Sequence, residues 1–81
     1  MSNEFLMAKG RLADCRNQIQ NAELRAESYM ISLRELLDPY RDFCSLELEK
    51  VLMLAKDFRD LQLRTRELLS LQEKIKDDFG L

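Results

Sequence analysis

Near the middle of the 81-residue chain lies the stretch Leu37-Asp38-Pro39-Tyr40-Arg41-Asp42-Phe43-Cys44-Ser45, which contains the only proline. Proline disfavours helical geometry at the residue before it and cannot donate a hydrogen bond to the carbonyl four residues earlier. An Asp-Pro pair is also a common signal for the start of a helix. The stretch therefore predicts a turn at about residues 38–44, between two segments of similar length.

Upstream of this turn, uncharged and mostly apolar residues recur at alternating steps of three and four. Such a heptad seam is typical of a coiled-coil helix, and we predict a helix over about residues 3–37. The ten seam positions are Phe5, Ala8, Leu12, Cys15, Ile19, Ala22, Ala26, Tyr29, Leu33 and Leu36.

A second, weaker seam follows the turn and includes three polar residues. We predict a helix over about residues 45–78, with Ser45 as a possible cap and Gly80 as the stop signal. Thr65 and Gln72 either lie at the edge of the seam or fix its register. The seam positions are Glu47, Val51, Leu54, Phe58, Leu61, Thr65, Leu68, Gln72, Ile75 and Phe79.

The two seams pair in an antiparallel arrangement in which the residue numbers of partners add to 83 or 84, as for Ala8 with Ile75 and Ala26 with Phe58. The midpoint of this pairing falls in the turn predicted from Pro39. The fold class is therefore all-α: one domain, residues 1–81, forming an antiparallel two-helix hairpin (coiled coil). The alternative is one continuous helix kinked at Pro39, which would be about 115 Å long.

Apolar residues remain that the hairpin seam does not use, and they gather in the half nearest the turn. An exposed patch of this kind usually marks an interface, so we expect a homodimer that forms a four-helix bundle. A helix of another protein is the other possible partner. Tyr40 and Phe43 are expected to cover the turn end of the seam. The predicted interface residues are Met30, Ile31, Leu37, Leu46, Leu48, Leu52, Met53 and Ala55.

The composition offers little for catalysis, since the chain has no histidine and no glycine-rich phosphate loop. Cys15 and Cys44 form no Cys-x-x-Cys pair, so we expect no metal site and no cofactor. Cys15 is predicted to be a small core residue and Cys44 an exposed thiol near the turn, too far from Cys15 for a disulfide. We expect the protein not to be an enzyme.

The formal net charge is −2, which gives no general attraction to nucleic acid. The one basic feature is a weak stripe of Arg59, Arg64 and Arg66, whose neighbouring acids favour a solvated helix face. The longest apolar run is five residues, Val51 to Ala55, far short of a membrane span. No basic leader precedes an apolar stretch, so we expect a cytoplasmic protein with no membrane partner.

These features predict a protein–protein interaction or assembly module, such as a small coiled-coil adaptor, a chaperone-like protein or a structural subunit. The expected architecture resembles short helical hairpins found among secretion-system chaperones and small bacteriophage proteins, and no motif singles out either group. The alternative is a dimeric nucleic-acid-associated regulator, in which dimer symmetry would double the stripe of Arg59, Arg64 and Arg66.

Overall fold

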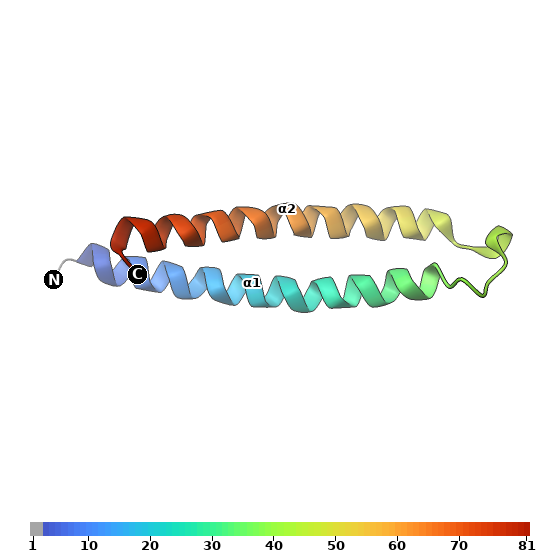
Figure 1. Ribbon diagram of the computed structural model, residues 1–81, viewed down its shortest axis with the longest axis horizontal. Coiled ribbons are helices and arrows are strands. Elements are labelled where there is room, and N and C mark those ends of the chain that lie inside the picture. The colour runs from blue at the N-terminus through green and yellow to red at the C-terminus, as the bar shows by residue number, and fades with distance from the viewer. Residues whose placement is uncertain (1–2) are drawn as a thin grey trace.

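The computed structural model describes residues 3–81 and consists of two long antiparallel helices joined at one end (Figure 1). Helix α1 is Asn3–Leu36 and helix α2 is Leu48–Phe79, with the short 3-10 helix η1, Phe43–Ser45, between them. The molecule measures 64 × 15 × 14 Å. The predicted hairpin is therefore confirmed, and the single kinked helix is wrong because such a helix would be about 115 Å long.

The seam of α1 faces α2 along its whole length. All ten predicted positions of α1 are buried or half-buried, and so are eight of the ten on the second seam; Glu47 and Phe79 at its two ends are exposed. Alternation of three and four residues keeps one stripe of each helix against the other. Among residues 3–81, six hydrophobic residues are buried: Ala8, Leu12, Cys15, Ile19, Ala22 and Ile75.

The predicted register holds. Ala8 and Ile75 belong to one buried cluster near the chain ends, and Ala26 and Phe58 line one cleft near the middle of the hairpin. Tyr29 stacks on Phe58 with ring centroids 5.5 Å apart. A shift of one heptad would displace the helices by about 10 Å and separate these partners.

The connection between the helices is longer than predicted, because it covers residues 37–47 rather than 38–44. It begins with a tight turn, in which the backbone N–H of Arg41 donates to the carbonyl of Asp38 at 3.1 Å. The carboxylate of Asp38 also accepts a hydrogen bond from the backbone N–H of Tyr40 at 3.0 Å. Pro39 occupies the second position of this turn, where its fixed φ is favourable.

Ser45 does not cap α2, which begins three residues later than predicted. Its hydroxyl donates to the carbonyl of Asp42 at 2.7 Å and so closes η1 instead. The residue immediately before α2 is Glu47, whose carboxylate pairs with Lys50 at 3.2 Å. At the other end, Gly80 adopts φ 64° and stops α2 as predicted.

None of the helices within residues 3–81 combines the length and the apolar character that crossing a bilayer requires.

Candidate protein interface

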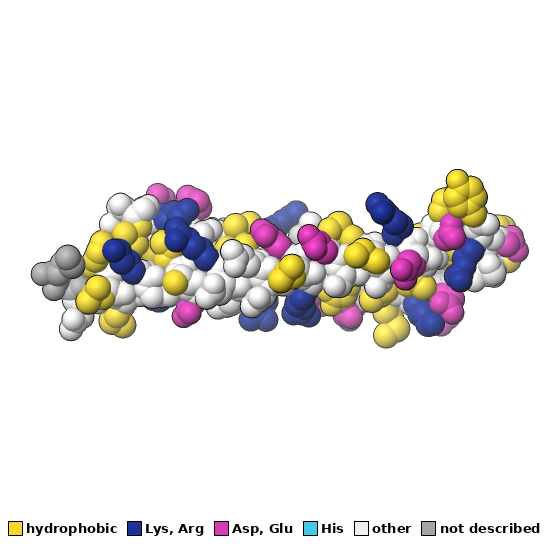
Figure 2. Space-filling model, turned by 90° about the horizontal axis from the view of Figure 1, so that it is seen from below, with side chains coloured by type: hydrophobic (Ala, Val, Ile, Leu, Met, Phe, Trp, Pro, Cys, Tyr) yellow, Lys and Arg dark blue, Asp and Glu magenta, His cyan; other side chains and the backbone are white. Residues whose placement is uncertain are grey.

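The predicted interface residues are largely open to solvent. Six of them, Met30, Ile31, Leu37, Leu48, Leu52 and Met53, are between 46% and 71% exposed. Ala55 is exposed too, and Leu46 in the connection is half-buried. Figure 2 shows hydrophobic side chains at the surface along the length of the hairpin, interspersed with charged ones.

On one side of the helix pair, side chains of α1 and α2 line a shallow groove that runs from the middle of the hairpin toward the turn. Glu23, Gln62 and two arginines stand at its rim. We call this feature the apolar groove and define it by its apolar lining, which is Ala22, Ala26, Leu33, Ala55, Phe58, Leu61 and Leu69.

Four predicted interface residues extend the apolar groove toward the turn. Residues seven apart on a coiled-coil helix face the same side. Met30 lies in α1 seven residues after Glu23, which lines the groove. Leu37 lies fourteen residues after Glu23, directly beyond the end of α1. Leu48 and Leu52 stand seven residues before the groove-lining Ala55 and Arg59. We call Met30, Leu37, Leu48 and Leu52 the flanking residues.

Two other predicted interface residues do not belong to this surface. Ile31 and Met53 each follow a flanking residue by one position, which turns their side chains about 100° further around the helix axis. Ile31 thereby faces away from α2, and Met53 lies toward the opposite side of the hairpin. The structure therefore divides the predicted set rather than bringing it together.

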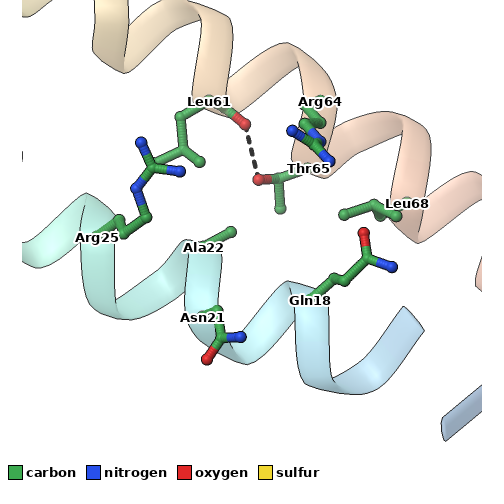
Figure 3. Close-up of a pocket in the computed structure, with 8 residues that line it drawn as sticks. All are labelled: Gln18, Asn21, Ala22, Arg25, Leu61, Arg64, Thr65 and Leu68. Carbon is green, nitrogen blue, oxygen red and sulfur yellow. Dashed lines mark hydrogen bonds between the residues drawn. The ribbon is translucent and has the colours of Figure 1, made fainter. Parts of the chain in front are cut away.

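The opposite side of the helix pair is more polar, and Ala22, Leu61 and Leu68 also line it (Figure 3). Gln18, Asn21 and Arg25 of α1 line a groove there together with Arg64 and Thr65 of α2. The Thr65 hydroxyl donates to the carbonyl of Leu61 at 2.7 Å, within its own helix. Because this bond does not reach α1, it gives no support to a role of Thr65 in fixing the register. Thr65 is half-buried between the helices and lines the grooves on both sides. The hairpin thus has one apolar side and one that is more polar.

The three arginines of the predicted basic stripe are divided between the two sides of the hairpin. Arg59 and Arg66 are seven residues apart and stand at the rim of the apolar groove. Arg64 lines the polar groove together with Arg25, Asp57 and Asp60. A continuous stripe of the three is therefore not present.

The sequence reasoning missed several exposed apolar side chains. Tyr40 and Phe43 do not cover the turn end of the seam, because they are 96% and 75% exposed. Leu6, Met7 and Leu24 are between 61% and 66% exposed on α1. The heptad assignment already contained the signal for these three residues, since each lies off the seam.

The two cysteines occupy the environments predicted for them. Cys15 is 3% exposed and packs with Ala8, Leu12 and Ile75. Cys44 lies in η1 at the turn and is exposed, and both thiols are free. Among residues 3–81, His, Cys, Asp and Glu form no group of three or more that could hold a metal ion.

No family model matches this chain, and neither a curated protein nor a solved structure matches it. The candidate interface is therefore interpreted from its own geometry.

Proposed function

We propose that this protein is a non-catalytic protein–protein interaction or assembly module that acts as a homodimer, in which two hairpins form a four-helix bundle. The apolar groove and its flanking residues carry this proposal, because they form an apolar surface of two helices that no other part of residues 3–81 covers. Large apolar surfaces that stay exposed usually mark interaction sites.

The limited core of the hairpin supports the same proposal. Only six residues are buried among residues 3–81. A chain of this size rarely gains enough stability from a single core, and association with a partner is a common remedy. Packing two hairpins through their apolar grooves would bury a second stripe of each helix and give the layered core of a four-helix bundle.

A second copy is the partner we propose, because a surface present on every chain can pair with itself about a two-fold axis. The helix of another protein would instead leave the hairpin monomeric when pure. We do not put forward nucleic-acid binding, since a regulator of that kind needs one basic face and the arginines here divide between two sides.

Light scattering of the purified protein at micromolar concentrations tests the proposal. We expect about twice the chain mass of 9.6 kDa. A mass of one chain throughout the concentration range would contradict the homodimer and leave the groove to a different protein.

Two matched pairs of substitutions locate the interface. Leu52→Glu places a charge on the apolar side, whereas Met53→Glu places the same charge one residue away at nearly equal exposure, 71% against 69%. Met30→Glu and Ile31→Glu form the equivalent pair on α1, at 51% and 59%. We expect Leu52→Glu and Met30→Glu to dissociate the dimer while circular dichroism still shows helices. The two neighbouring variants should remain dimeric; the reverse pattern would place the interface elsewhere.

A further inference from the structure

We infer that two copies dock groove to groove in an antiparallel manner, with their turns at opposite ends, so that the acidic turn of each copy lies against Arg16 and Arg66 of the other. This arrangement rests on the homodimer proposed above and specifies its geometry.

The charges beside the apolar groove differ at its two ends. The turn end is acidic, because residues 38–50 contain Asp38, Asp42, Glu47 and Glu49 against Arg41 and Lys50, and Lys50 pairs with Glu47. The inner end is mainly basic: Arg66 stands at the groove rim with one acid, Glu23. Arg16 lies seven residues before Glu23, on the same side of α1.

In the antiparallel arrangement, the length of the apolar surface brings the acidic turn of one copy to the level of Arg16 and Arg66 of the other. The apolar groove and its flanking residues extend over residues 22–37 of the α1 side, about 22 Å. A two-fold axis through the middle of this stretch, at the level of Met30 and Ala55, lays apolar surface on apolar surface. Residues 38–44 of the second copy then reach the level of residues 15–21. Arg16 lies at this level, and so does Arg66, whose partner position across the hairpin is about residue 18 by the observed register.

The parallel arrangement has the opposite electrostatic consequence. With both turns at the same end, the acidic segments of the two copies would lie side by side, and Arg16 and Arg66 would face their own counterparts. Like charges in close proximity across an interface disfavour that arrangement. The apolar surface permits either orientation, so the charges select the antiparallel one.

Cys44 provides a probe of this geometry, because it is exposed at the turn whereas Cys15 is buried. A spin label on Cys44 should give an inter-chain distance of about 40 Å in the antiparallel dimer, from the helical rise between the axis and the turn. Labels in a parallel dimer would lie within about 25 Å, the width of a four-helix bundle. Cys44→Ser treated with the same reagent is the control for stray labelling of Cys15.

The outcomes separate this inference from the proposed function. A distance near 40 Å in a sample of dimer mass supports the antiparallel arrangement. A distance below about 25 Å at dimer mass overturns the arrangement and leaves the homodimer standing. A chain that stays monomeric contradicts the homodimer and this inference together.

Charge reversal gives an independent test. Arg66→Glu should weaken dimerisation about tenfold, because the contact with the acidic turn occurs twice in a symmetric dimer. Arg64→Glu makes the same change on the polar side and should have little effect. Asp42→Arg combined with Arg66→Glu should restore much of the lost affinity. Equal effects of the two arginine variants, or no rescue by Asp42→Arg, would overturn the inference.

Salt acts in opposite directions on the two arrangements. Added salt screens charges that lie at a surface. The antiparallel dimer should therefore dissociate more readily at 0.5 M than at 0.05 M sodium chloride, and Arg66→Glu should reduce this dependence. Stronger association at high salt would indicate that like charges meet, as in the parallel arrangement, and would contradict our inference.

Discussion

The terminal half of the hairpin (residues 3–22 and 62–81) and the turn half (residues 23–61) follow the same heptad spacing but bury it to different extents. All six buried residues lie in the terminal half, and none of residues 23–61 is buried. The seam positions of the turn half are half-buried at best. Equal spacing has therefore produced one closed region and one open region.

Side-chain size accounts for only part of this difference, since Ala26 of the turn half is small and still half-buried. The terminal half places Ala8, Cys15 and Ala22 in the seam, and small residues between two helices are readily enclosed by their neighbours. The turn half places Tyr29 and Phe58 there, stacked on each other. Rings of this size extend beyond a two-helix contact, so part of their surface stays outside it. A heptad pattern therefore predicts which residues face a partner helix, but it does not predict how completely their side chains are buried.

The largest effect that follows from this comparison concerns the aliphatic cores of the two halves. Ile75→Ala should lower the free energy of unfolding by about 2–5 kcal/mol, since it leaves a cavity among Ala8, Leu12 and Cys15. Leu33→Ala in the half-buried seam of the turn half should cost less, because the site already meets solvent. Urea denaturation of both variants measures the difference.

The protein concentration must be kept where the chain is monomeric for this comparison, because a dimer would cover Leu33 and raise the cost of its substitution. A larger loss for Leu33→Ala than for Ile75→Ala under monomeric conditions would show that the turn half contains the more stabilising core.

A smaller effect concerns the stacked rings of the turn half. A double-mutant cycle with Tyr29→Ala and Phe58→Ala should give a coupling of about 0.5–1.5 kcal/mol, as is typical of aromatic pairs. The same cycle on Ala8→Gly and Ile75→Ala serves as a reference in the terminal half. Additive effects of the two aromatic substitutions would mean that the stack at 5.5 Å contributes no specific stabilisation.

Much of the fold could be predicted from the sequence, because it depends on periodicity. The seams and the pairing of Ala8 with Ile75 follow from the positions of apolar residues, which the core cluster reproduces. The start of α2 could not be placed in the same way. Ser45 can serve as a helix cap or close a 3-10 turn, and the choice depends on the path of the chain after Asp42.

For the candidate interface, only the presence of surplus apolar residues could be predicted from the sequence, and not the face that each of them occupies. The sequence shows a surplus of apolar residues near the turn, but assigning them to one face needs the helix phase relative to a partner. Leu52 and Met53 are neighbours in sequence and lie about 100° apart around α2. For the same reason, Arg64 lies on a different side of the hairpin from Arg59 and Arg66, although the three arginines are close in the sequence.

The smallest effect concerns Gly10, an exposed glycine within α1 in the terminal half. A Cβ at Gly10 would meet no atom within 4 Å among residues 3–81 apart from its two chain neighbours and the adjoining backbone of α1. Gly10→Ala should therefore raise the free energy of unfolding by about 0.5–1 kcal/mol, through the lower backbone entropy of the unfolded chain alone. Thermal denaturation measures this gain, and a decrease in stability would show that the site is not open.

Hydrogen exchange on the Gly10→Ala protein would then extend the comparison from burial to local stability. Regions that open independently differ in how far a local substitution protects their amides. If the two halves open separately, amides around Gly10 should exchange more slowly and those of residues 23–61 should be unchanged. Equal slowing in both halves would mean that the hairpin opens as one cooperative unit. The stability of the turn half would then depend on that of the terminal half, and a partner bound to the apolar groove would stabilise the whole chain.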